Sequence, residues 1–153
     1  MEVVFDDGAN VLVRRGDLFV QVRCGPMTLE SIELLTALWR SMRRPEMRSI
    51  GALFVLEPGA PVPTAEVRAR QTELFREMAR DGRLRGALVI EGSGVEVTLK
   101  RSVARVLFIG RQVAIVSGVD EGVAALVRVL GAGVRAEALA LLEAARERLH
   151  RSR

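Results

Sequence analysis

The sequence predicts an α/β domain with a mixed sheet, in which antiparallel N-terminal strands precede three parallel strands that alternate with helices. Two observations predict this class. Three short strand-like runs separated by glycine turns open the chain. Three nearly continuous apolar runs, residues 50–56, 84–90 and 112–117, then alternate with amphipathic stretches. Such alternation is typical of buried parallel strands joined by right-handed helical crossovers.

The first 23 residues predict an antiparallel meander. Residues 3–5, 10–14 and 18–23 are rich in β-branched residues, and the Asp-Gly and Gly-Asp pairs between them suit tight hairpin turns. In the third run every second residue is aliphatic, which predicts a strand with one buried face. The aliphatic set is Leu18, Val20 and Val22, and it alternates with Phe19, Gln21 and Arg23.

The apolar run 50–56 is predicted to be the central strand. One helix is expected before it in the sequence and one after it. Thr28 can cap the first helix, whose apolar residues recur every three or four positions from Leu29 to Met42. A loop with three prolines covers residues 57–63. Thr64 can then cap the second helix, which ends near Asp81.

Three further helices follow the second apolar run. The third helix carries an apolar stripe expected to face the core, with Lys100, Arg101 and Arg105 on the outside. That stripe comprises Val95, Leu99, Val103, Val106 and Leu107. Asp120 is expected to cap the fourth helix, which closes at Gly131.

The last helix spans Arg135 to about His150. It carries a stripe of Leu139, Leu142, Ala145 and Leu149, with Glu143, Arg146 and Glu147 expected outside. We therefore divide the chain into a domain of residues 1–131 and an appended C-terminal helix, 132–153. The stripe suits either packing on the same domain or a homodimer contact.

Composition restricts the classes of function. With 49% hydrophobic and 27% charged residues, the 153-residue chain is globular in composition. The acidic N-terminus lacks the features of a secretory signal, and the apolar runs are shorter than the roughly 20 residues of a membrane span. Cys24 is the only cysteine, which excludes an internal disulfide. A cytoplasmic protein without a membrane segment is expected.

The net charge of +4 comes almost entirely from arginine. Arg68, Arg70, Arg76 and Arg80 spread round the second helix, without interleaved surface aromatics or a nucleic-acid reading motif. Solvated helix faces explain this pattern better than a nucleic-acid groove.

No catalytic constellation is visible in the sequence. His150 is the only histidine and stands in an arginine-rich tail where fraying is expected, so nucleophile–histidine pairs are disfavoured. The Gly92-Ser93-Gly94 turn lacks the third glycine of a dinucleotide site. We expect no enzyme activity, no cofactor and no metal.

The chain resembles the STAS domain, the fold of anti-sigma-factor antagonists and related single-domain bacterial proteins. The resemblance covers residues 3–131 and depends on the element order and on two segments. One is Ala-Leu-Val-Ile-Glu at 87–91 leading into a helix, and the other is Val-Ala-Ile-Val at 113–116 followed by the acidic helix start at 120–126.

The resemblance implies a non-catalytic regulatory or scaffolding module that docks another protein through the helix after the central strand. The docking residues it implies are Pro61, Val62, Thr64, Arg68 and Gln71. In many members a serine at this helix start is phosphorylated. Here the Asp-Ser motif is replaced by the proline-rich loop, and Thr64 is the candidate phosphoacceptor.

An alternative function places a small molecule or lipid at the carboxyl edge of the parallel strands. Glu57 and Glu91 each end a buried strand, and Gly94 follows in the strand-to-helix turn. Open α/β sheets bind ligands at this edge. The sequence leaves both functions open.

Overall fold

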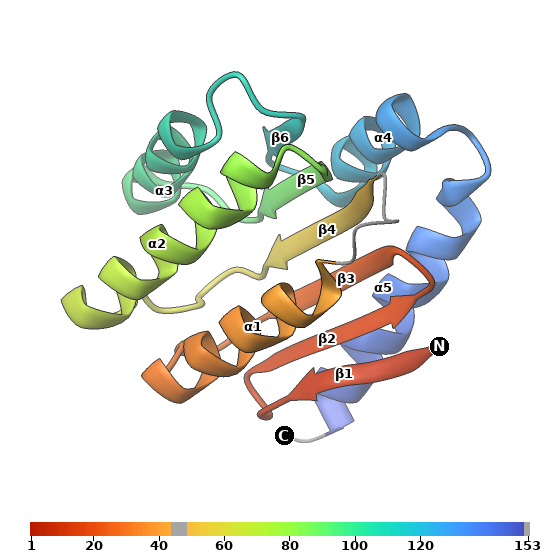
Figure 1. Ribbon diagram of the computed structural model, residues 1–153. Helices are drawn as coiled ribbons and strands as arrows, with labels where there is room; N and C mark the ends of the chain where they lie inside the picture. The colour runs from red at the N-terminus through yellow and green to blue at the C-terminus, as the bar shows by residue number, and fades with distance from the viewer. Residues whose placement is uncertain (44–48, 152–153) are drawn as a thin grey trace.

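The computed structural model describes residues 1–43 and 49–151, whose strands form one mixed sheet. The strands lie across the sheet in chain order (Figure 1): β1 (Glu2–Asp6), β2 (Asn10–Arg15), β3 (Leu18–Arg23), β4 (Ile50–Leu56), β5 (Leu84–Ile90) and β6 (Val113–Val116). The pairs β1–β2 and β2–β3 are antiparallel, whereas β3–β4, β4–β5 and β5–β6 are parallel. The predicted fold class and the parallel run of apolar strands are confirmed, and β3 joins that run as its first member.

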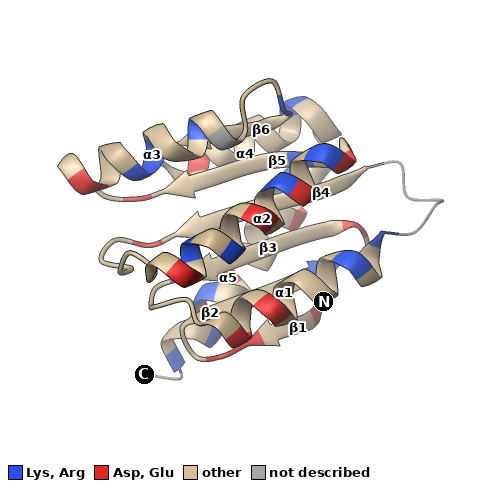
Figure 2. Cartoon of the chain, turned by 60° about the vertical axis from the view of Figure 1, so that its left-hand side comes forward, with Lys and Arg blue, Asp and Glu red and all other residues tan. Residues whose placement is uncertain are grey.

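The helices cover both faces of the sheet. The crossover helices α1 (Leu29–Met42), α2 (Ala65–Asp81) and α3 (Val95–Leu107) lie on one face, as Figures 1 and 2 show from two directions. Helices α4 (Val119–Leu130) and α5 (Val134–Arg151) lie on the other. Each face has its own hydrophobic core. Within the described residues, no helix is both long and apolar enough to traverse a bilayer.

Helix α5 packs on its own chain, across β2 and β3. Leu142 and Leu149 are almost fully buried in the core on this face, and Leu139 is 39% exposed. The segment with His150, for which fraying was expected, is helical as far as Arg151, and Leu149 in the same turn is fully buried. The expectation that Arg146 faces outward is wrong, since its guanidinium forms ion pairs at the sheet edge.

Strand β3 is buried on both faces, contrary to the expectation of one buried face. Leu18, Val20 and Val22 pack beneath α5, as the alternation predicted. Phe19 and Arg23 are also buried, with exposures of 3% and 7%, because they lie under the layer of α1–α3. Arg23, a charged residue at the end of this strand, therefore lies inside the protein.

The orientation of helix α3 differs from the prediction, because most of its apolar stripe is exposed to solvent instead of buried. Val95, Val106 and Leu99 are 88%, 72% and 62% exposed, and Val103 is exposed as well. The side chain of Leu107 lies outside what the structure describes. The inward-turned side chains include the small Ala104, which is buried, and two basic groups. Lys100 donates to the Ala60 carbonyl at 3.1 Å, and Arg101 donates to the carbonyls of Ile90 and Gly92. Arg105 is exposed, as predicted.

The start of α4 also differs from the prediction. Gly118 occupies the N-cap position without a side-chain hydrogen bond, and Asp120 lies in the first turn. The carboxylate therefore acts on the positive end of the helix dipole rather than as a cap. Thr28 and Thr64 do cap α1 and α2, as predicted, because each hydroxyl accepts a backbone amide of the first turn.

Candidate functional site: a cavity between the sheet and three helices

A cavity of about 520 Å³ lies between the sheet and helices α1–α3. The sheet contributes Leu12, Phe19, Ala52, Phe54 and Leu88, and helix α1 contributes Ile32, Leu35 and Trp39. Helix α2 adds Leu74, Phe75 and Met78. This volume lies in the range of pockets that bind small organic molecules, which are also mostly apolar.

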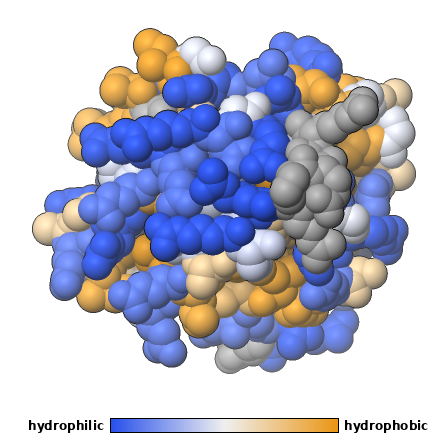
Figure 3. Space-filling view, in the orientation of Figure 1, coloured by the Kyte–Doolittle hydropathy of each residue, from blue (hydrophilic) through white to orange (hydrophobic). Residues whose placement is uncertain are grey.

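The cavity opens to solvent between α2 and α3. Leu99 and Val103 line it and are nevertheless 62% and 53% exposed, and Val62 at the rim is 47% exposed. Figure 3 shows hydrophobic surface over α3, beside a mainly hydrophilic surface over α2. The carbonyl contacts of Lys100 and Arg101 hold α3 in the orientation that leaves this apolar rim uncovered.

One end of the cavity is polar. Gln21 and Arg23, at the carboxyl end of β3, both line the cavity. Arg23 Nη1 is buried and has no hydrogen-bond partner among the described residues. Burial lowers the pKa of the Arg23 guanidinium, but an arginine side chain stays protonated at neutral pH. The cavity wall thus contains a buried positive charge.

Among the described residues, no hydrogen bond joins the Arg23 side chain to the polar residues nearest in register, and the buried Oδ1 of Asn10 also lacks a hydrogen-bond partner. Asn10 is the antiparallel partner of Arg23, and its amide donates to both oxygens of Asp7 at 3.1 and 3.2 Å. Asp7 also accepts the Ser31 hydroxyl at 2.6 Å. Although burial opposes it, the hydrogen bonds from Ser31, Ala9 and Asn10 hold the pKa of Asp7 below its ordinary value. Asp7 is therefore a satisfied carboxylate that anchors the β1–β2 turn to α1.

Trp39 lines the opposite half of the cavity. Helix α1 runs back from the carboxyl end of β3 towards the start of β4, so Trp39 lies far along it from Arg23. Its indole Nε1 is buried and lacks a hydrogen-bond partner among the described residues. The chain contains one tryptophan and no tyrosine, so its fluorescence reports on this cavity alone.

The structure brings three of the five predicted docking residues to the cavity. Val62, Arg68 and Gln71 belong to its lining, whereas Pro61 and Thr64 lie on the exposed surface outside it. The Thr64 hydroxyl accepts the backbone amide of Val67 at 3.4 Å, which is its capping role. The predicted recognition helix is thus also one wall of the pocket.

Glu57 and Glu91 do come together at the carboxyl edge of the strands, but they are held by α5. Arg146 Nη2 lies 2.8 Å from a Glu91 oxygen, and Arg146 Nε lies 3.3 Å from Glu57. His150 Nε2 is 3.4 Å from the same Glu57 oxygen. Gly94 is the N-cap of α3, with φ of 103°. These residues are absent from the cavity lining, so this edge is an anchor for α5 rather than a part of the pocket.

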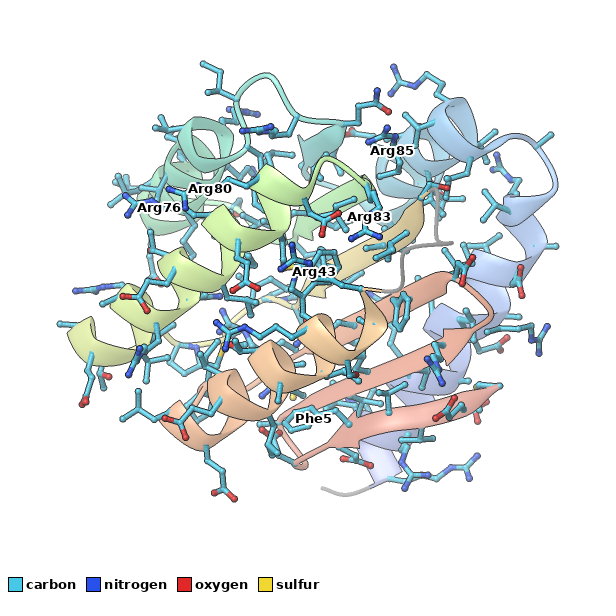
Figure 4. All side chains as sticks on the ribbon, in the orientation of Figure 1. Phe5, Arg43, Arg76, Arg80, Arg83 and Arg85 are labelled. Atoms are coloured by element: carbon cyan, nitrogen blue, oxygen red, sulfur yellow. The ribbon has the colours of Figure 1, made fainter. Side chains whose placement is uncertain are left out.

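A second cluster of charges joins the ends of α1 and α2. Asp81 is paired with Arg43 at 2.8 Å and with Arg83, which Figure 4 shows close together between the two helices. Glu77 pairs with Arg40 and Arg43. Arg76 and Arg80 lie on the exposed side of α2 (Figure 4), in keeping with the solvated face expected from the sequence.

Four charged side chains are among the described residues that line the cavity. Its lining carries the charged groups of Arg23, Arg68, Glu96 and Lys100, of which Glu96 and Lys100 form an ion pair at 2.6 Å. His150 and Cys24 belong to the opposite face of the sheet. Throughout residues 1–43 and 49–151, no group of three or more His, Cys, Asp or Glu side chains is arranged to hold a metal ion.

No family model, curated protein or solved structure matches this chain. The assignment of a function therefore depends on the geometry of the cavity. Sequence reasoning missed Arg23 and Trp39 as site residues. One signal could have identified Arg23 as a site residue. It lies at the end of a strand that pairs with the central strand, and a strand in that position has both faces covered.

Proposed function

We propose that this chain is a non-catalytic module that binds a mostly apolar small molecule in the cavity beneath α1–α3. The observation that supports the proposal is the cavity of about 520 Å³, which is open to solvent and lined largely by aliphatic and aromatic side chains. The function corresponds to the small-molecule alternative drawn from the sequence. Its location differs, because the residues involved lie beneath the helices and not at Glu57, Glu91 and Gly94.

The exposed apolar rim supports an entry route for such a ligand. Leu99 and Val103 on α3 and Phe75 on α2 all line the cavity, and Leu99 and Val103 are exposed, so an apolar molecule meets apolar side chains as it enters. Burying apolar surface contributes about 25 cal/mol per Å², which favours transfer of the ligand from water.

Energy transfer from Trp39 tests the proposal. N-phenylnaphthylamine is an uncharged apolar fluorophore that absorbs where tryptophan emits. We expect saturable transfer from Trp39 to this probe, because the indole lines the cavity. Ala104→Phe, which adds a ring to the lining, should weaken binding, whereas the same substitution at the exposed Ala136 of α5 should leave it unchanged. Absence of saturable transfer in the unmodified protein would contradict the proposal.

A protein partner is a second candidate, favoured by the exposed apolar residues on α3 and at Val62. Val95 and Val106 on α3 are 88% and 72% exposed, and Ile109, just after this helix, is 78% exposed. The STAS resemblance places docking on the adjacent loop and α2, with Thr64 as the candidate phosphoacceptor. A partner that binds the unmodified chain and Leu139→Glu, but not Val62→Glu combined with Val106→Glu, would support this function.

We also propose a cytoplasmic location and self-association of the chain. Self-association through α5 would use the exposed side of that helix, since Leu142 and Leu149 are buried in their own domain. The exposed Leu139 is the apolar residue of the predicted stripe that stays accessible for such a contact.

A further inference from the structure

Arg23 is the feature of the cavity that points to a ligand class. The residue is 7% exposed, lines the cavity, and has a buried Nη1 without a hydrogen-bond partner among the described residues. A buried charge without a counter-charge is strongly unfavourable, because it loses its hydration and gains nothing in return. An anion bound beside Arg23 would restore the missing interaction.

The described residues do not supply that anion. Within the described part of the chain, no carboxylate forms an ion pair with Arg23. Asp7, on the neighbouring turn, is occupied by Asn10 and Ser31. Glu96, the carboxylate in the cavity lining, lies 2.6 Å from Lys100. The described residues therefore leave the charge of Arg23 available to an anion from outside the protein.

The rest of the cavity indicates the chemistry of the remainder of the ligand, beyond its anionic group. Along β3, Arg23 is in register with Leu56 near the carboxyl edge, and Phe19 with Ala52 further back. Beyond Phe19, the lining continues through Trp39, Met42 and Ile50. A ligand that fills this space has a charged end at Arg23 and an apolar body beyond it.

Building on the proposed function, we propose that the cavity binds an anionic amphiphile, with a carboxylate or phosphate head on Arg23 and a single apolar chain against Phe19 and Trp39. The planar guanidinium suits either head group, because it donates two parallel hydrogen bonds to paired oxygens. Gln21 lies on the same strand face and offers an additional amide donor to the head group.

The first experiment compares cis-parinaric acid with its methyl ester. Both carry the same polyene chain, which accepts energy from Trp39, and they differ in the negative charge. We expect the acid to bind about 10- to 100-fold more tightly, which is the range for a charge-assisted hydrogen bond. Competition by palmitate, hexadecyl phosphate and uncharged hexadecanol then distinguishes the carboxylate and phosphate sources of the anion.

Variants of the whole chain assign the effect to Arg23. Arg23→Met should bind the acid and the ester with similar affinity, because the methionine retains apolar contact and removes the charge. Arg76→Met removes one positive charge from the exposed side of α2, outside the lining, and should retain the preference for the acid. Circular dichroism checks that each variant is folded, and the acid-to-ester comparison in the unmodified protein needs no variant.

The outcomes separate this inference from the function on which it rests. If N-phenylnaphthylamine and the ester bind but the acid binds no better, the cavity is a binding site and the anionic head group is wrong. If hexadecanol displaces cis-parinaric acid as effectively as palmitate and hexadecyl phosphate do, the inference is overturned in the same way. If none of the probes binds, the proposed function itself fails. A preference for anions that Arg23→Met abolishes supports both.

Discussion

At the scale of single residues, Arg23 combines two properties that folded proteins seldom combine. It is charged at neutral pH, and it lies in a wall composed mainly of hydrocarbon. Buried charges normally have a partner, and here the described residues provide none. Arginine at this position therefore costs stability in the ligand-free protein and contributes affinity when an anion is bound.

This cost predicts the stability of a variant. We expect Arg23→Met to raise the free energy of unfolding of the ligand-free protein by about 1–4 kcal/mol, the range found when hydrophobic residues replace buried ion pairs. Urea unfolding followed by Trp39 fluorescence measures this difference. Arg76→Met is the control, with an expected change within about 0.5 kcal/mol. An Arg23→Met variant less stable than the unmodified protein would argue for an unrecognised role of Arg23 in the fold.

The role of Arg23 was not predictable from the strand pattern. Leu18, Val20 and Val22 alternate with Phe19, Gln21 and Arg23 in the way that a strand with one wet face also does. The pattern identifies which residues share a face, and it was correct on that point. It does not tell whether the second face meets water, a helix or a cavity, because that depends on where α1 and α2 pack.

At the scale of elements, ion pairs determine how the ends of α1 and α2 meet. Asp81 ends α2 and is 1% exposed at its side chain, between Arg43 at the C-cap of α1 and Arg83 before β5. Hydrogen bonds from Arg83, assisted by the charge of Arg43, hold the pKa of Asp81 below its ordinary value. One carboxylate thus joins two helices and a strand at the amino edge of the parallel strands.

The lowered pKa of Asp81 predicts a dependence of stability on pH. The ionised carboxylate stabilises the folded state above the pKa of an unfolded aspartate, about 3.9. That stabilisation is lost as the pH falls from there through the lower pKa of the folded state. Asp81→Asn should be less stable at pH 7 and lose less stability on acidification, as measured by urea unfolding.

Glu33→Gln is the matched control for this experiment, since Glu33 is exposed on α1. It removes one carboxylate without affecting the contacts between α1 and α2. A parallel acid response in Asp81→Asn and the unmodified protein would show that other groups dominate the pH dependence.

Helix α3 shows why element prediction succeeded while its orientation failed. The spacing of Val95, Leu99 and Val103 correctly predicted a helix. An apolar stripe has the same period whether a sheet covers it or not, so the spacing does not determine the buried side. The orientation depends instead on Lys100 and Arg101, whose side chains donate to a carbonyl in the loop between β4 and α2 and to the carbonyl at the end of β5. These contacts join residues 40 and 11 positions apart.

At the scale of the whole molecule, the order and type of the elements were predictable because each has a local signal. Turn glycines, capping threonines and continuous apolar runs all lie within a few residues of the elements they define. The cavity was not predictable, because it is bounded by residues from seven elements between Leu12 and Ala104. The partnership of Arg146 with Glu91 is likewise a contact between residues 55 positions apart.

The packing of α5 predicts a large effect of one substitution. Leu149 is fully buried beneath β2 and β3, so Leu149→Ala should reduce the free energy of unfolding by about 2–5 kcal/mol through lost contacts and a cavity. Leu139→Ala, on the same helix but 39% exposed, should cost much less. Urea unfolding at several protein concentrations measures both effects. A midpoint that rises with concentration would indicate that α5 also packs between two chains.

The chain-order arrangement of the strands has a consequence for synthesis on the ribosome. Each new strand emerges next to the edge formed by its predecessor, so the sheet grows in one direction without rearrangement. The cover of β2 and β3 on one face is α5, which is made only after all the described strands. The apolar face of the β2–β3 hairpin therefore stays exposed until translation has passed Leu149. We expect a nascent-chain chaperone to matter most for this hairpin.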